Sequence, residues 1–71
     1  MELKIGCVYR HYKGNLYRII AFARHSETLE DLVIYEALYE NGGTWARPRE
    51  MFCDHVTVGG KTVRRFSPES E

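Results

Sequence analysis

The sequence IIAFARHSETLEDLVIYEALYENGGTWARP, residues 19–48, decides the fold. It contains two runs rich in aromatic and β-branched residues, a polar loop between them and a glycine-rich turn. It also contains Trp45, the only tryptophan of the chain. Aromatic and β-branched side chains are favoured on the pleated surface of a sheet. The stretch therefore predicts consecutive strands joined by short connections.

Both runs alternate with a period of two, which is typical of strands with one core face. The first run, residues 16–25, contains no proline or glycine. One face of it is expected to carry Tyr17, Ile19, Ala21, Ala23 and His25. In the second run, residues 31–39, one face is expected to carry Val33, Tyr35, Ala37 and Tyr39. A short helix is the alternative for residues 29–38, because some of its apolar residues also recur at helical spacing.

The glycine-rich turn predicts a hairpin. Asn41 and Gly42 follow an apolar run, and both residue types tolerate positive φ at little steric cost. We therefore expect residues 31–39 to pair antiparallel with residues 44–47. Pro48 should end this pairing, since proline has no N–H to donate.

The flanking sequence completes an all-β domain. Three further strands are predicted: residues 7–12, 54–58 and 62–66. Residues 49–52, led by Pro48, are expected to form a short helical or 3-10 turn before the fifth strand. Residues 67–71 are polar and are expected to be frayed.

Five to six short antiparallel strands predict a small SH3-like barrel, with residues 1–71 as a single domain. Closing the sheet would remove edges through which so small a protein could aggregate. An OB-like barrel is the alternative, although that fold usually has longer strands and a full helix.

Composition limits the classes of function. Of the 71 residues 44% are hydrophobic, which is enough for a packed core. Ten basic and ten acidic residues give a formal charge of zero, which argues against strongly electrostatic binding of nucleic acid. The basic residues are concentrated in residues 1–25 and the acidic ones in residues 26–54, so ion pairs between neighbouring strands are expected.

The compartment is predicted from two absences. The first residues lack the apolar core of a secretory signal peptide, and no run approaches the roughly 20 apolar residues of a membrane span. We therefore expect a cytoplasmic protein without a membrane partner. Cys7 and Cys53 are expected to be free thiols in that reducing compartment.

Four strings of the sequence resemble the bacterial DUF1653 family. They are YRHYKGNLYR at residues 9–18, ARHSETLE at residues 23–30, YEALY at residues 35–39 and WARPREMF at residues 45–52. The first two strings are unusual enough to be specific. The resemblance implies a small bacterial SH3-like β-barrel domain and carries no assigned activity.

The densest polar string, residues 24–28, lies where a strand leaves the sheet. Binding residues concentrate on loops held by a rigid scaffold. The functional interpretation is a site for an anionic or planar ligand, with Arg24 or Arg47 supplying a bidentate guanidinium. In the structural interpretation, hydroxyl side chains cap a turn and Glu27 pairs with an arginine.

Aromatic residues allow two further interpretations. Trp45 and Arg47 share one strand face, so an exposed Trp45 could stack a base beside a cation. We favour the alternative that Trp45 fills the core of a very small barrel. The five tyrosines could form an aromatic cage, but such rings more often pack inside with the hydroxyl in water.

Metal binding and catalysis have weaker support. Five side chains are possible metal ligands: Cys7, His11, His25, Cys53 and His55. Cys7 and His11 lie about 13 Å apart on an extended strand, too far to share an ion, so we predict no metal and no cofactor. We also predict no enzyme. A hydrolase with His25 as general base and Glu27 as its orienter is the alternative, with Cys53 as a possible nucleophile.

We therefore predict a binding module for a small anionic or nucleotide-like ligand, or for single-stranded nucleic acid. The candidate site residues are Arg24, His25, Ser26, Glu27, Arg47, Tyr35, His11 and Trp45. The second hypothesis is an assembly domain without a small-molecule ligand, which forms a homo-oligomer or joins a larger enzyme through an exposed strand edge or apolar patch.

Overall fold

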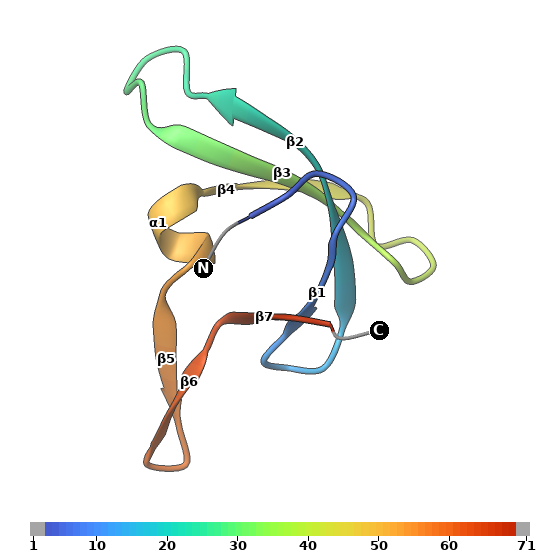
Figure 1. Ribbon diagram of the computed structural model, residues 1–71, viewed down its shortest axis with the longest axis vertical. Coiled ribbons are helices and arrows are strands. Elements are labelled where there is room, and N and C mark those ends of the chain that lie inside the picture. The colour runs from blue at the N-terminus through green and yellow to red at the C-terminus, as the bar shows by residue number, and fades with distance from the viewer. Residues whose placement is uncertain (1–2, 70–71) are drawn as a thin grey trace.

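Seven strands and one short helix form within residues 3–69, the part of the chain that the computed structural model describes (Figure 1). In chain order the elements are β1 (Val8–His11), β2 (Leu16–Arg24), β3 (Asp31–Ala37), β4 (Thr44–Pro48), α1 (Arg49–Phe52), β5 (His55–Val58), β6 (Lys61–Arg64) and β7 (Phe66–Pro68). The all-β prediction is confirmed, and residues 31–37 are strand rather than helix.

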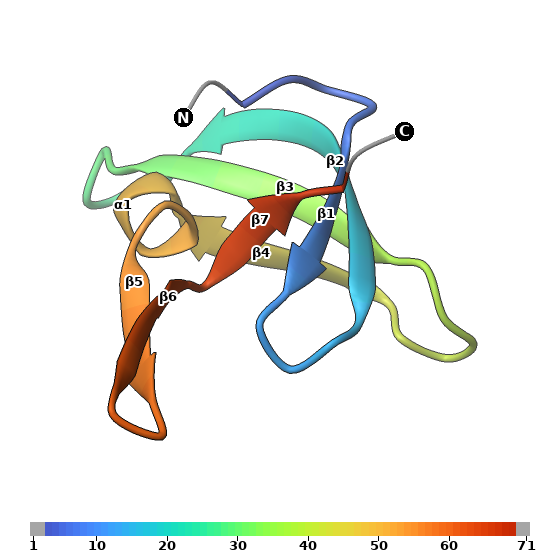
Figure 2. The ribbon, with the colours of Figure 1, turned by 60° about the horizontal axis from the view of Figure 1, so that its bottom comes forward.

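The strands form two antiparallel sheets. The first has five strands in the order β4-β3-β2-β1-β7, and the second is the β5–β6 hairpin (Figure 2). The predicted hairpin between β3 and β4 is confirmed: Leu32 pairs with Pro48, and Glu36 pairs with Thr44. Asn41 adopts the positive φ of 64° that its turn requires.

A β-bulge interrupts β2 and exchanges its two faces. Ile19 pairs with Tyr35 and Phe22 pairs with Val33, so three steps along β2 match two steps along β3. Phe22 therefore lies on the face that Ile19 occupies before the bulge. The alternation predicted for this run, with Ala21 on that face, is wrong beyond the bulge, because the inserted residue shifts the period-two pattern.

The core lies on the concave side of the first sheet. Its buried residues are Leu3, Tyr9, Ile19, Val33, Tyr35, Phe52 and Phe66. At its centre Phe52 and Phe66 stack with ring centroids 4.0 Å apart and an interplanar angle of 5°. Tyr9 and Tyr35 each meet the ring of Phe52 edge-on, at 5.5 Å. The helix and the last strand thus supply the two rings around which the core packs.

The five-stranded sheet has two open edges. Within residues 3–69, β4 and β7 do not pair with each other, so a closed SH3-like barrel is not confirmed. Side chains join the two edges instead. The guanidinium carbon of Arg47 on β4 lies 5.7 Å from the ring centroid of Phe66 on β7.

The chain beyond β5 differs from the prediction, which had one strand followed by a frayed tail. Arg65 separates β6 from β7 because its N–H donates to the Asp54 carbonyl at 3.0 Å and its carbonyl accepts from the Tyr12 N–H at 2.9 Å. Ser67 pairs with Arg10 of β1, so this part of the tail is ordered. Residues 70 and 71 lie outside the described residues.

The short turn before β5 is α-helical rather than 3-10. The Cys53 N–H donates to the Arg49 carbonyl at 3.1 Å, the spacing of an α-helical hydrogen bond. Pro48 occupies the position before the first helical residue, with φ −54°. Cys53 and Cys7 are free thiols, as predicted. None of the helical residues within 3–69 forms a helix long and apolar enough to cross a membrane.

Two predicted ion pairs link neighbouring strands. Arg18 of β2 lies 3.6 Å from Glu36 of β3, and Arg24 lies 3.9 Å from Asp31 on the same two strands. Both pairs are largely exposed, so each adds little to stability.

The central stack generates a stability prediction. Phe66→Ala should lower the free energy of unfolding by about 3–5 kcal/mol, because it removes a buried ring and leaves a cavity against Phe52. Urea denaturation measures this loss. Ile5→Ala serves as the control, because Ile5 is 62% exposed, and should change stability by about 0.5 kcal/mol or less. Equal losses in the two variants would contradict a core centred on this stack.

Candidate functional site

The polar string predicted as a site forms a self-contained loop between β2 and β3. The Nδ1 atom of His25 accepts hydrogen bonds from the N–H groups of Glu27 and Thr28, at 3.1 and 3.2 Å. The Thr28 hydroxyl donates to a carboxylate oxygen of Glu30 at 3.1 Å and accepts from the Glu30 N–H at 3.2 Å. Ser26 is exposed in the same turn. Thr28 thus supports the turn as in the structural interpretation, but the predicted pairing of Glu27 with an arginine is not found among the ion pairs of residues 3–69.

Arg24 ends β2 beside this loop. Its Nε atom lies 3.9 Å from a carboxylate oxygen of Asp31, and both side chains are 69% exposed. Leu16, at the other end of β2, pairs with Arg10, the neighbour of His11. Eight residue steps along the strand separate Leu16 from Arg24, about 26 Å. Arg24 and His11 thus lie near opposite ends of β2, whereas Arg47 on β4 pairs with Val33, which itself pairs with Phe22 of β2.

A second group of polar residues gathers around Phe66, and Arg47 is at its centre. Arg47 is partly buried on β4, and its Nε donates to the Tyr35 hydroxyl at 3.2 Å. Its guanidinium covers the Phe66 ring. Within residues 3–69, no carboxylate forms an ion pair with Arg47. The positive charge is therefore held against apolar surface without an ion pair in that part of the chain, and the carboxylate that interacts with it, Asp54, is hydrogen-bonded to Arg65 instead.

His11 lies beside this guanidinium at the end of β1. Its ring is 4.9 Å from that of Phe66 and 4.6 Å from that of Tyr12. Burial lowers the pKa of His11, and the positive charges of Arg47, Arg65 and Lys13 lower that pKa further. Three cations from β4, from the bend between β6 and β7 and from the turn after β1 thus converge on one imidazole.

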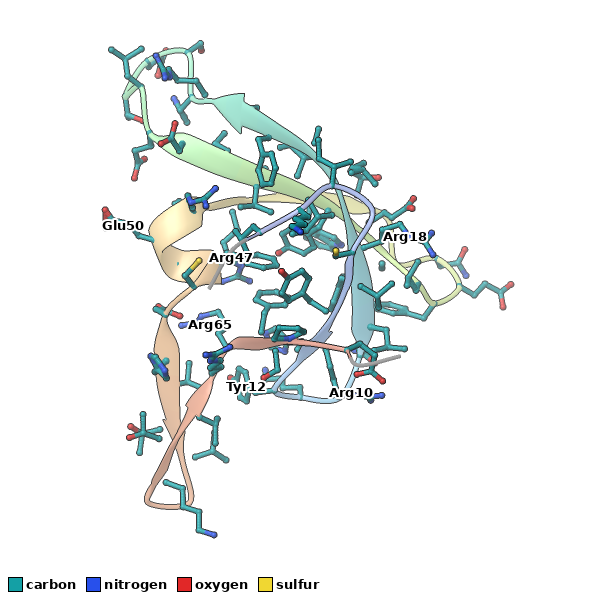
Figure 3. All side chains as sticks on the ribbon, in the orientation of Figure 1. Arg10, Tyr12, Arg18, Arg47, Glu50 and Arg65 are labelled. Atoms are coloured by element: carbon teal, nitrogen blue, oxygen red, sulfur yellow. The ribbon has the colours of Figure 1, made fainter. Side chains whose placement is uncertain are left out.

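One of these three cations already has a partner. Arg65 holds Asp54 through its Nε at 2.7 Å and through an Nη at 3.4 Å. The hydrogen bond from Arg65 lowers the pKa of the Asp54 carboxyl, and the positive charges nearby act in the same direction. Figure 3 shows Arg47, Arg65 and Tyr12 on one side of the molecule, with Arg18 well apart from them. Within residues 3–69 the other two cations, Arg47 and Lys13, make no ion pair, and Arg47 is the one that is partly buried.

Trp45 is 53% exposed, so the favoured prediction that it fills the core is wrong. Its indole N–H donates to the Gly42 carbonyl at 2.7 Å, which holds the ring over the β3–β4 turn. A Cβ atom at Gly42 would overlap Ala37, so only glycine fits there. Phe52 and Phe66 fill the centre instead, and Trp45 remains at the edge strand on the same face as Arg47.

The tyrosines pack edge-to-face against one another. Tyr17 meets Tyr35 at 5.3 Å and Tyr39 at 5.8 Å, both as T-shaped pairs. The hydroxyls of Tyr17 and Tyr39 are 3.0 Å apart. Burial, together with this hydrogen bond, raises the pKa of Tyr17 to about 12. The rings are thus mutual packing partners with their hydroxyls paired, which is the common arrangement rather than a cage.

A cavity lies elsewhere, between the β2–β3 loop and α1. Its volume is about 130 Å³, and it is lined by Glu30, Asp31, Pro48, Arg49 and Glu50. Its acidic lining does not suit an anion. Among residues 3–69, no group of three or more His, Cys, Asp and Glu side chains is arranged to hold a metal ion.

The structure brings together four of the predicted site residues: His11, Tyr35, Arg47 and Trp45. Sequence reasoning missed Tyr12, Lys13 and Arg65. The first two could have been found because they follow His11 directly in the string YRHYKGN. Nothing in the sequence signals Arg65, because its approach to His11 depends on how β7 pairs with β1.

Comparison with known proteins identifies the family. The family model DUF1653, described as a protein of unknown function, matches residues 7–68. The chain belongs to the DUF1653 family. A crystal structure of a DUF1653 protein from Bordetella bronchiseptica is similar, with a TM-score of 0.81 and 35% sequence identity over 93% of this chain and 86% of that one. None of the curated proteins matches the chain.

In this DUF1653 protein the charges around His11 generate a pH prediction. NMR titration should give His11 a pKa below its ordinary value of 6.5, and Arg47→Gln should raise that pKa because one nearby positive charge is removed. Folded His11 binds a proton less readily than unfolded His11. Its contribution to stability is therefore lost as the pH falls from 6.5 through the folded pKa.

The matched control is Arg18→Gln, which removes the same charge from the pair with Glu36. It should leave the titration of His11 unchanged. An unchanged pKa in Arg47→Gln would contradict the placement of this guanidinium beside His11.

Proposed function

We propose that this protein is a binding module for an anionic ligand, which Arg47 binds beside His11. The observation that carries the proposal is the partly buried guanidinium of Arg47, which has no ion-pair partner within residues 3–69. A charge withdrawn from water costs free energy unless it is paired. An anion bound at Arg47 would supply the missing partner.

The geometry of Arg47 suits a bidentate contact. Its Nε is occupied by the Tyr35 hydroxyl, and the Phe66 ring lies against one side of the guanidinium. The Nη donors remain for a phosphate or carboxylate group, which arginine binds with two parallel hydrogen bonds. The tyrosine and the ring fix the orientation of the guanidinium before a ligand arrives, and this reduces the entropy lost on binding.

The Arg47 site is a better candidate than the β2–β3 loop. Arg24 is 69% exposed and already faces Asp31, so it gains less from a ligand than a desolvated guanidinium does. The Nδ1 atom of His25 accepts hydrogen bonds within its loop, but that of His11 likewise accepts one from the Lys13 N–H at 3.2 Å, so the choice rests on the arginines. We therefore assign the ligand-binding role predicted for residues 24–27 to Arg47 and His11.

Ligand binding at Arg47 can be tested with pyrophosphate in a thermal-shift assay. At one hundred times its dissociation constant a ligand adds about 2.7 kcal/mol, which raises the melting temperature of so small a domain by roughly 10–20 °C. Arg47→Gln should abolish the shift, whereas Arg18→Gln should keep it. The shift should grow as the pH falls toward the pKa of His11, because an anion favours the protonated imidazole. A shift that survives in Arg47→Gln would place the anion elsewhere.

A second candidate function, self-assembly, is favoured by the β5–β6 hairpin, which extends away from the five-stranded sheet (Figure 2). Val56, Val58 and Val63 share one face of it, and the last two are 46% and 36% exposed. Isolated two-stranded hairpins are at best marginally stable in water. A second copy of the chain could cover this face.

The assembly proposal predicts a mass above that of one chain in light scattering. Val58→Asp should reduce it to the monomer by placing a charge on the contact face. Arg47→Gln should leave the mass unchanged. A wild-type protein that stays monomeric at every concentration measured would exclude self-assembly through this hairpin.

A further inference from the structure

Two exposed aromatic rings lie in the surroundings of Arg47. Trp45 is two residues away on the same strand face and is 53% exposed. Tyr12 is 37% exposed and lies against His11, and the positive charge of Arg47 contributes to lowering the pKa of His11. Rings that remain in water beside a cation are the surfaces on which nucleic-acid bases stack, because every base presents a π face.

Cations alternate with these rings. The Nζ of Lys13 lies 5.9 Å from the ring centroid of Tyr12. Arg65 interacts electrostatically with the Tyr12 hydroxyl and with His11. Pairwise proximity thus links Trp45 to Arg47, Arg47 to His11 and His11 to Tyr12, with Lys13 and Arg65 beside Tyr12. We name these six residues the aromatic–basic row. Bases and phosphates alternate in the same way along a single strand.

The aromatic–basic row lies on an exposed surface rather than in a cleft, which favours a polymer over a small molecule as its ligand. Small-molecule sites usually enclose 70–90% of the ligand surface in a cleft. Trp45, Tyr12 and Lys13 are all exposed, and they come from β4 and from the turn after β1 rather than from the walls of one cavity. The 130 Å³ cavity beside α1 is acidic and does not belong to the row. A ligand that contacts the whole row must be extended.

The charge of the protein favours a single strand over a duplex. Ten basic and ten acidic residues cancel, so long-range attraction to the dense charge of a duplex is weak. The bases of a duplex are stacked on each other and cannot reach Trp45 or Tyr12. A single strand offers its bases to these rings and its phosphates to Arg47.

We infer that the anionic ligand is a single-stranded nucleic acid, with its phosphates on Arg47 and Lys13 and its bases on Trp45 and Tyr12. This inference rests on the anion-binding function proposed above and names the class of its ligand. Contacts of this kind release counter-ions from the strand. With two phosphates contacted, the logarithm of the affinity should fall with the logarithm of salt concentration with a slope of about −1.4.

The experiment measures fluorescence anisotropy of a labelled single-stranded oligonucleotide of about twelve nucleotides, within the range that small single-strand-binding domains cover. Trp45→Ala and Tyr12→Ala should each weaken binding about fivefold or more, the loss expected for one stacked base. Binding of pyrophosphate should be unchanged in both variants. Arg47→Gln should weaken the binding of both ligands. It should also make the affinity for the oligonucleotide less dependent on salt concentration.

The matched ring control is Phe22→Ala. Phe22 is 41% exposed and lies under Arg49 at 5.7 Å, so it is also an exposed ring beside an arginine, but outside the row. Arg18→Gln is the matched charge control. Both variants should bind the oligonucleotide as the wild type does. Losses in Phe22→Ala equal to those in Trp45→Ala would overturn the inference, because binding would then not be specific to the row.

The remaining outcomes separate the inference from the proposed function. Pyrophosphate binding that depends on Arg47, with no tighter binding of the oligonucleotide, would overturn the inference and leave the proposed function standing. Equal affinity for a duplex, or displacement of the strand by polyglutamate, would also overturn it. If neither pyrophosphate nor the oligonucleotide binds, both proposals fail.

Discussion

The stacking of Phe52 on Phe66 is the contact on which the arrangement of this small protein depends. No backbone pairing joins β4 to β7 within the described residues, so the sheet is not closed by hydrogen bonds. The helix that follows β4 brings one ring, and β7 brings the other. Their contact at 4.0 Å draws the two ends of the sheet together around one core. The fold thus encloses apolar surface with two aromatic side chains where a closed barrel would use a strand pair.

The same stack positions the candidate site. Arg47 and His11 both pack on Phe66 of β7. His11 lies on β1, which pairs with β7, and Arg47 lies on β4, at the other edge of the sheet. A guanidinium over a ring gains a cation–π attraction, but this does not replace a counter-ion. His11 stays neutral more readily because the surrounding charges are positive. The core therefore maintains a local excess of positive charge in a protein with no net charge.

Local signals predicted much of the fold. Asn41 and Gly42 predicted the β3–β4 hairpin, and period-two alternation located the strands β2 and β3, although it assigned the faces of β2 correctly only up to the bulge. The bulge in β2 was not predictable, because one inserted residue leaves the pattern intact on either side of it. The break at Arg65 depends on hydrogen bonds to Asp54 and Tyr12, which are distant in sequence. Features set by tertiary contacts were therefore the ones that periodicity could not show.

The candidate site was also only partly predictable from the sequence. A dense polar string such as residues 24–28 is conspicuous in a sequence, yet a tight loop needs polar side chains to satisfy its own backbone, and His25 does so. The informative feature is the missing partner of Arg47. A missing partner cannot be read from a sequence in which ten acidic residues balance ten basic ones. It becomes evident only from the positions of the carboxylates within residues 3–69, none of which forms an ion pair with Arg47. A cation held against the core in this way is the group that gains most from a ligand.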